Sequence, residues 1–228
     1  MTAFNAGLLT GWHLGDLLDC VEGVCYAVDR SYRLVATGST RWDEFARSNG
    51  AKQLTSAAVL GTNIIDMVQD EDVRDIYRRH FHSVIATARP VALSSRCDSP
   101  GVKRELRLSM TPLHIAGLVY GILVQAVTVS ETVRPPIDLF DAQKLAALFE
   151  NESVLPIITL CSFCQRIKAL HRAEWQEAEE YYRAGGTSKV RISHGLCGDC
   201  AVKHNYVDEI GQDDSAAIRG AASAGDNP

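Results

Sequence analysis

The sequence lacks both the long apolar runs of membrane-spanning chains and the basic excess of nucleic-acid-binding chains. Its longest apolar segment, near 115–129, is interrupted by Gly117, Gly121 and Gln125. It therefore falls short of the about 18 apolar residues that cross a bilayer. The formal net charge is −5 and no basic run is present, which argues against nucleic-acid binding because that needs a positive surface.

The sequence also lacks the short motifs of common enzyme classes. It has no phosphate-binding glycine loop, no nucleophile elbow and no H-E-x-x-H zinc motif. The first residues carry no positive charge ahead of their apolar positions, and they reach Asp16 too early for a signal peptide. We therefore expect a non-enzymatic protein with no membrane association. It should lie in the cytoplasm, where thiols stay reduced.

The apolar pattern that is present predicts an α+β chain with five strands. Alternating apolar residues and intervening turns predict these strands over 23–28, 32–37, 90–97, 102–113 and 117–131. Short helices are expected between the second and third strands. A further amphipathic helix is expected within 1–22, where it would cap the domain or contribute to a dimer contact.

The strongest helix prediction covers DEDVRDIYRRHFHSVIATARP, residues 70–90. Three acidic residues fill its first turn, which suits the helix dipole, and Pro90 fixes its end. An apolar stripe runs along it through Val73, Tyr77 and Val84. At about 100° per residue His80 falls inside this stripe, whereas His82 falls on the opposite side.

This order of elements resembles the PAS family of sensory domains. The resemblance is carried by GVCYAVDRSYRLVATGSTRWDEFA, by LGTNIIDMVQDEDVRDIYRRHFHSVI and by the three closing strands, close to half of the chain. It implies a curved, five-stranded antiparallel sheet with flanking helices around a small-molecule pocket, within 23–131. A profilin-like or GAF-type sensor domain remains an alternative. PAS domains bind haem, flavin or small metabolites, or nothing.

The resemblance also implies which side chains face such a pocket. They are Trp42, Phe45, Tyr77 and Met110, with His80 as the axial ligand if haem b is the cofactor. The alternative for each of these residues is an ordinary place in the core. The segment LTSAAVLGTNIIDMV corresponds to the cysteine-containing segment of flavin photosensors but has no cysteine, which argues against blue-light adduct chemistry.

Four of the seven cysteines form two C-x2-C pairs, C-S-F-C at 161–164 and C-G-D-C at 197–200. Two intervening residues let both sulfurs of a pair reach one ion, and four thiolates suit tetrahedral zinc. We predict a structural zinc site formed by Cys161, Cys164, Cys197 and Cys200. An iron–sulfur cluster and a redox-active dithiol remain alternatives for the same residues.

The segment 155–210 resembles a treble-clef zinc finger, with a knuckle after a strand and a second cysteine pair that opens a helix. It also resembles the four-cysteine tails behind PAS domains in some bacterial signalling proteins, on the stretches LPIITLCSFCQRIK, AEWQEAEEYY and ISHGLCGDC. That likeness implies no established activity. Basic and acidic residues are equal in number over 156–210, which favours protein contact over DNA binding.

Two further segments complete the predicted organisation. A linker helix is expected over 132–154, after the stiff T-V-R-P-P sequence, and a disordered tail over 211–228. We interpret the chain as a homodimeric regulatory protein that senses a small molecule or redox state and signals to a protein partner. The alternatives are a haem-based gas or redox sensor that uses His80, a dithiol redox protein and a transcriptional regulator.

Overall fold

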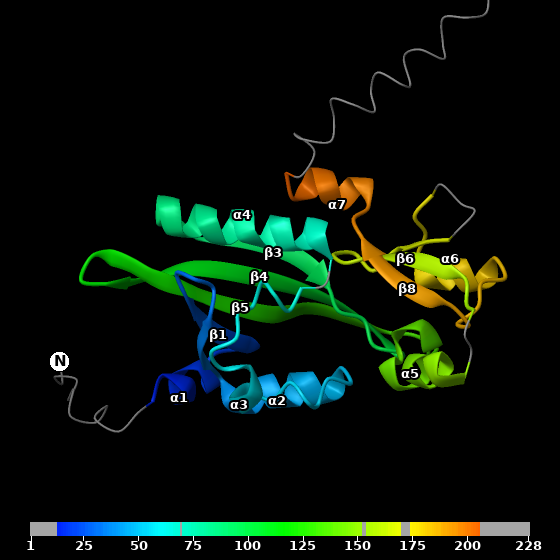
Figure 1. Cartoon of the computed structure of the whole chain (residues 1–228), viewed down its shortest axis with the longest axis horizontal. Helices are drawn as coiled ribbons and strands as arrows, with labels where there is room; N and C mark the ends of the chain where they lie inside the picture. Colours follow the sequence, from blue (N-terminus) through cyan, green and yellow to red (C-terminus); the bar gives the residue numbers. More distant parts are fainter. Residues whose placement is uncertain (1–12, 69, 152–153, 170–173, 206–228) are drawn as a thin grey trace, which may run out of the picture.

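The computed structural model describes residues 13–68, 70–151, 154–169 and 174–205. It shows a five-stranded antiparallel sheet with helices against it, and a smaller three-stranded unit at one end (Figure 1). The predicted α+β class with a PAS-like sheet and a small cysteine-bearing unit is confirmed. The predicted tail over 211–228 lies outside the described residues, as does the first part of the predicted N-terminal helix.

The large sheet has the strand order β2-β1-β5-β4-β3. Its strands are β1 (Val24–Asp29), β2 (Leu34–Thr37), β3 (Val91–Arg96), β4 (Val102–Ile115) and β5 (Leu118–Val133). The central strand β5 pairs with both β1 and β4, so that Val124 is opposite Tyr26 on one side and Met110 on the other. All five predicted strands are present, and β5 extends past the predicted end at 131.

The helices of this part lie where the apolar pattern predicts them. They are α1 (Leu14–Asp19), α2 (Ser39–Ser48), α3 (Ser56–Val59) and the long α4 (Glu71–Thr87). The carboxylate of Asp70 accepts a hydrogen bond from the Val73 amide, and so caps the start of α4. The helix ends at Ala88, which has a left-handed backbone with a φ of 53°.

The apolar stripe of α4 contributes to two separate cores. Phe81 and Val84 are buried against the sheet, in a core with Val28, Met110 and Ile122. The first turns of α4 instead bury Val73 and Ile76 against the cysteine-bearing unit. One helix face therefore fixes the position of both parts of the chain.

The second part, which we name the four-cysteine module, comprises residues 137–205. Its elements are η2 (Asp138–Phe140), α5 (Ala142–Asn151), β6 (Ile157–Cys161), β7 (Ile167–Lys168), α6 (Ala178–Arg183), β8 (Arg191–Gly195) and α7 (Gly198–Lys203). Strand β6 pairs with β7 in antiparallel fashion and with β8 in parallel fashion. The segment predicted as a linker contributes Ile137 and Leu139 to the core of this module.

A buried group of charges joins the module to the sheet. The Asp98 carboxylate is fully buried and lies 2.5 Å from the Arg96 guanidinium and 3.1 Å from that of Arg134. The same two arginines contact Glu177 and Glu179, at the start of α6, at 2.8 and 3.0 Å. We call these five residues the Asp98 cluster. Asp98 also accepts a hydrogen bond of 3.2 Å from the Arg104 amide, so the charge of this enclosed carboxylate is compensated by protein groups.

We expect Asp98→Asn to destabilise the chain, because it leaves two buried guanidinium groups without the carboxylate between them. The expected loss is about 3 kcal/mol in the free energy of unfolding, measured by urea denaturation. Asp138→Asn is the control, since Asp138 is 44 % exposed and pairs with Lys144, and it should cost less than about 1 kcal/mol. Equal effects for the two variants would contradict the structural role of the Asp98 cluster.

Candidate metal centre

The first cysteine pair is placed by a tight turn between β6 and β7. Cys161 is the last residue of β6, and its amide donates to the Arg166 carbonyl across the turn at 2.8 Å. Gln165 adopts a left-handed backbone with a φ of 59°, and its amide donates back to the Cys161 carbonyl. The chain therefore reverses direction around Cys164, which forms the knuckle predicted from the sequence.

The second pair follows β8, which runs parallel to β6 and so delivers Cys197 beside Cys161. The Cys197 amide is 3.5 Å from the Cys161 sulfur, and the Cys200 amide is 3.4 Å from the Cys197 sulfur. Cys197 is also the N-cap of α7. A knuckle after one strand and a helix after the second pair is the arrangement expected of a treble-clef module.

The four sulfur atoms all lie within 4.8 Å of one another. Four sulfurs around one zinc ion, at about 2.3 Å from it, would be about 3.8 Å apart. The sulfurs of Cys164 and Cys197 are 3.6 Å apart, close to that value. The four cysteines are thus positioned to bind a metal ion, in a geometry compatible with zinc.

Arg166 completes this site, although nothing in the sequence pattern marked it. Its guanidinium lies 3.3 Å from the Cys164 sulfur and 3.2 Å from the Cys197 sulfur, and it pairs with Asp199 at 2.6 Å. Hydrogen bonding to Cys164, and then to Asp199, raises the pKa of Arg166. The guanidinium is therefore a fixed positive charge beside two sulfurs that bind metal as thiolates.

The Cys164 thiol is the one most strongly favoured as a thiolate. Hydrogen bonds with Cys161 and Cys200, and then with Arg166, lower the pKa of Cys164 well below its ordinary value. By contrast, the hydrogen bond with Cys164 raises the pKa of Cys161 to about 11. A bound cation would shift all four thiols toward thiolate, since metal ions bind cysteine in that form.

A small hollow of about 180 Å³ lies in the PAS-like part, where the resemblance implied a ligand pocket. It is lined by Tyr26, Ile64, Ile65, Met67, Val68, Tyr77 and Phe81. Of the five predicted pocket residues only Tyr77 is among them. Alternation along β1 puts Tyr26 on the same side as Val24 and Val28, and Phe81 lies in the apolar stripe of α4. The sequence pattern could therefore have indicated both residues.

The other predicted pocket residues have different surroundings. Met110 is fully buried in the sheet core. The Trp42 ring packs edge-on against Tyr26 at 5.6 Å, and its indole nitrogen donates to the Leu54 carbonyl. Phe45 is half-buried on α2, away from the lining of the hollow. These three side chains do not line this hollow, because the neighbours of a core side chain depend on tertiary packing; their role in a ligand pocket stays a prediction.

His80 points toward the four-cysteine module and does not line the hollow. Its ring centroid lies 6.5 Å from that of His204, the residue that ends α7. Burial, and then nearby Arg79, lowers the pKa of His80, and burial with His80 nearby lowers the pKa of His204 to about 4. The hollow is also smaller than the about 300 Å³ of a small ligand pocket, so the structure lends no support to haem.

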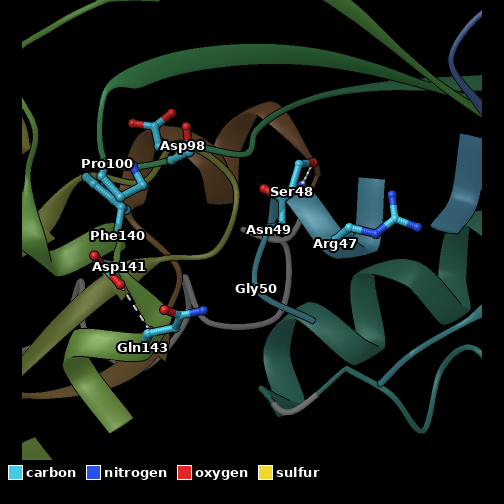
Figure 2. A pocket seen from close by; sticks show the side chains of 10 residues that line it. Arg47, Ser48, Asn49, Gly50, Asp98, Pro100, Phe140, Asp141 and Gln143 are labelled. Atoms are coloured by element: carbon cyan, nitrogen blue, oxygen red, sulfur yellow. Dashed lines mark hydrogen bonds between the residues drawn. The ribbon is translucent and has the colours of Figure 1, made fainter. Parts of the chain in front are cut away.

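Another hollow, of about 220 Å³, lies between the end of α2 and the start of α5 (Figure 2). Asp98, Pro100 and Phe140 form one side of it, and Ser48 and Asn49 lie across from them (Figure 2). None of the predicted site residues contributes to this hollow. Its lining mixes acidic, basic and apolar groups without a set of donors that would select one ligand.

The sheet, its covering helices and the cysteine module define a sensor-like PAS fold joined to a candidate metal centre. Similar solved structures include the PAS domain of histidine kinase ThkA, at 17 % identity and a TM-score of 0.35, over 47 % of this chain and 99 % of that one. The PAS domain of Bordetella pertussis BvgS is 20 % identical, with a TM-score of 0.39, over 60 % and 93 % of the two chains.

A Vibrio cholerae VqmA dimer structure, described as a LuxR-type receptor, is 14 % identical with a TM-score of 0.40, over 50 % of this chain and 49 % of that one. No protein-family model and no curated protein matches the sequence. The PAS-like description rests on the strand order and covering helices of this chain rather than on these similarities. Among the described helices, none has the length and apolar character that a bilayer crossing needs.

We expect the purified chain to carry one metal ion that depends on the four cysteines. Cys161→Ser should abolish stoichiometric metal, measured by elemental analysis of the protein, because it removes a fully buried ligand. Cys20→Ser is the matched control, since Cys20 is exposed and outside the cluster, and it should retain full metal content. Metal retained at full stoichiometry in Cys161→Ser would refute the site.

Arg166→Ala is expected to weaken metal affinity by about 10-fold to 100-fold, because it removes the positive charge beside two thiolates. Lys168→Ala removes a positive charge from the next strand without touching the sulfurs, and it should leave the affinity unchanged. Competition with a chromogenic chelator measures both values. An Arg166→Ala affinity equal to that of Lys168→Ala would show that the guanidinium does not support the metal.

Proposed function

We propose that the chain is a signalling protein in which the PAS-like part receives a small molecule and the four-cysteine module passes the signal to a protein partner. The single observation that carries this proposal is the position of Tyr77. It lines the hollow of the PAS-like part, and its ring stacks on Phe163 at 6.1 Å with an interplanar angle of 22°. Phe163 is in the knuckle, between Cys161 and Cys164.

Phe163 is held by two further contacts. Its ring lies 4.0 Å from that of His204, and its carbonyl accepts a hydrogen bond of 2.7 Å from the Arg96 amide on β3. Because protein interiors are close-packed, a ligand that fills the hollow would displace the Tyr77 ring away from it and toward Phe163. A ligand that shifts Tyr77 must therefore shift the knuckle as well.

The hollow restricts the ligand to a small and mainly apolar molecule. Its lining is aliphatic and aromatic apart from the tyrosine hydroxyls and the methionine sulfur. Burial raises the pKa of Tyr77 to about 12, and burial also raises the pKa of Tyr26. Both phenols are neutral at physiological pH and offer hydrogen bonds without charge. A molecule with a few heavy atoms and one polar group fits these surroundings.

Zinc is the metal that we propose for the cysteine cluster. Four thiolates from two C-x2-C pairs close the coordination sphere, so no position is left for a catalytic water. The ion would hold the knuckle and α7 together, and it supplies folding energy rather than chemistry. The absence of an open position is the reason to propose a regulatory protein and not an enzyme.

We further propose that the protein acts as a cytoplasmic homodimer that contacts another protein rather than nucleic acid. The supporting observations are a formal net charge of −5 and the equal numbers of acidic and basic residues over 156–210. A tetrathiolate zinc site would add negative charge to that surface, which disfavours phosphate backbones. Thiols that must stay reduced to bind zinc also fit a reducing compartment.

Ile64→Phe tests the coupling because it adds bulk to the hollow at a position that does not touch the module. We expect it to change hydrogen exchange in the knuckle, 161–166, with an overpacking cost of about 1–3 kcal/mol. Leu60→Phe, on an exposed side chain of the same segment, should leave the knuckle unchanged. Mass spectrometry of the metal-loaded chain measures exchange peptide by peptide.

A second variant separates coupling from general destabilisation. In a Tyr77→Leu background the ring between the hollow and Phe163 is gone, so Ile64→Phe should no longer alter the knuckle. Phenol, which matches the size and polarity of the hollow, should reproduce the effect of Ile64→Phe in the unmodified chain. The proposal fails if Ile64→Phe changes exchange only within the sheet and α4.

A further inference from the structure

The four cysteines differ sharply in exposure. Cys161, Cys197 and Cys200 are buried, with exposures of 0, 1 and 5 %, whereas Cys164 is only partly buried. A hollow of about 290 Å³ lies between the knuckle and the sheet, and Cys164 and Cys200 both line it. The cluster is therefore accessible from one side, and Cys164 is the sulfur that a small solute meets there.

The rest of that hollow suits a small polar solute. Besides the two cysteines, its lining comprises polar and charged residues, Ser94, Ser95, Arg96, Glu105 and Lys203, and the apolar residues Leu106, Val129 and Phe163. The Ser94 and Ser95 hydroxyls and the Lys203 ammonium can hydrogen-bond an incoming oxygen compound, and Lys203 can stabilise negative charge that develops on it. The Arg96 guanidinium is already held by Asp98 and Glu177.

A second observation concerns the partner of Cys164. Its sulfur lies 3.6 Å from that of Cys197, and the Arg166 guanidinium touches both sulfur atoms. A disulfide needs about 2.05 Å between sulfurs, so a small movement of the knuckle is enough to form one. The guanidinium keeps positive charge beside both sulfurs, and the thiolate is the form that attacks an oxidant.

We propose that Cys164 is an oxidation site for small hydroperoxides and that Cys197 resolves the oxidised sulfur as a disulfide, with release of the metal. This inference goes beyond small-molecule sensing by the PAS-like part, and it rests on the proposed zinc ion. It assigns different roles to four cysteines that the sequence presents as equivalent.

The chemistry balances with the hydroperoxide as the two-electron oxidant. The Cys164 thiolate attacks one peroxide oxygen, the O–O bond breaks, and the products are a sulfenic acid and an alkoxide or hydroxide that takes a proton from water. The Cys197 thiolate then attacks the Cys164 sulfur, an S–S bond forms, and hydroxide leaves and takes a second proton. Zinc leaves because only Cys161 and Cys200 remain as thiolate ligands.

The structural consequence is local and follows from the position of Phe163. The knuckle holds this ring against Tyr77 and His204, and it is anchored by two of the four metal ligands. Loss of the ion removes the folding energy that the site supplies, so the knuckle and α7 lose their fixed positions. Oxidation at Cys164 would thus alter the contact between Phe163 and Tyr77, which is also the contact that a ligand in the PAS-like part would alter.

The test uses the full zinc-loaded chain in a Cys20→Ser background, which removes the exposed thiol outside the cluster. Zinc content is measured first, so that failure of the zinc assignment is distinguished from failure of the oxidation. Hydrogen peroxide is then added, released zinc is followed with a chromogenic chelator, and disulfides are mapped by peptide mass spectrometry. We expect one zinc released per Cys164–Cys197 disulfide formed.

A pair of valine variants tests access without altering any ligand. Val129 lines the hollow and Val133 lies further along the same strand, outside it, and both side chains are exposed. Val129→Trp should slow peroxide-driven zinc release several-fold, whereas Val133→Trp should leave the rate unchanged. Equal rates for the two variants, or a disulfide that omits Cys164 or Cys197, would overturn the proposal.

Discussion

The packing of one aromatic ring, Phe163, against α4 is the contact on which the arrangement of the molecule depends. The ring reaches Tyr77 from the closed knuckle, and the same turn brings Cys161 and Cys164 to within 4.8 Å of the second cysteine pair. The carbonyl of the same residue bonds to β3, next to the buried Asp98 cluster. The cysteine cluster, an aromatic contact and a buried group of ion pairs therefore meet at a single turn of chain.

The parts of the fold that sequence patterns predicted are those whose signals are local. The period of α4, the acidic residues at its start and the alternation along β4 are all set by neighbouring residues, and both elements were predicted close to their observed bounds. The two C-x2-C pairs are equally local, because spacing alone tells which sulfurs can share an ion. Their convergence needed only a parallel pairing of β6 and β8, which delivers the second pair beside the first.

The features that were missed depend on contacts between distant segments. Helix α6 begins only at Ala178, although the apolar spacing of AEWQEAEEYY would extend it back to Trp175, since Gln176 pairs with Ile167 and Glu177 caps the helix. In the sequence Arg166 is one charged residue among many, and only the fold places its guanidinium against sulfurs on two separate segments. The side chains that line the small hollow differ from the predicted set for the same reason. The packing of α4 on the sheet decides which apolar side chains meet, and a stripe on one helix does not contain that information.

The shared face of α4 limits how this chain can be divided. Its first turns bury Val73 and Ile76 under the knuckle, while its later turns belong to the sheet core. A fragment cut at 132–136 would leave those two side chains and the Asp98 carboxylate facing water, and the carboxylate without Arg134. Such a fragment would tend to self-associate through its new apolar patch. We therefore expect the PAS-like part to need the four-cysteine module in order to fold, so that it could not be transferred alone to another protein.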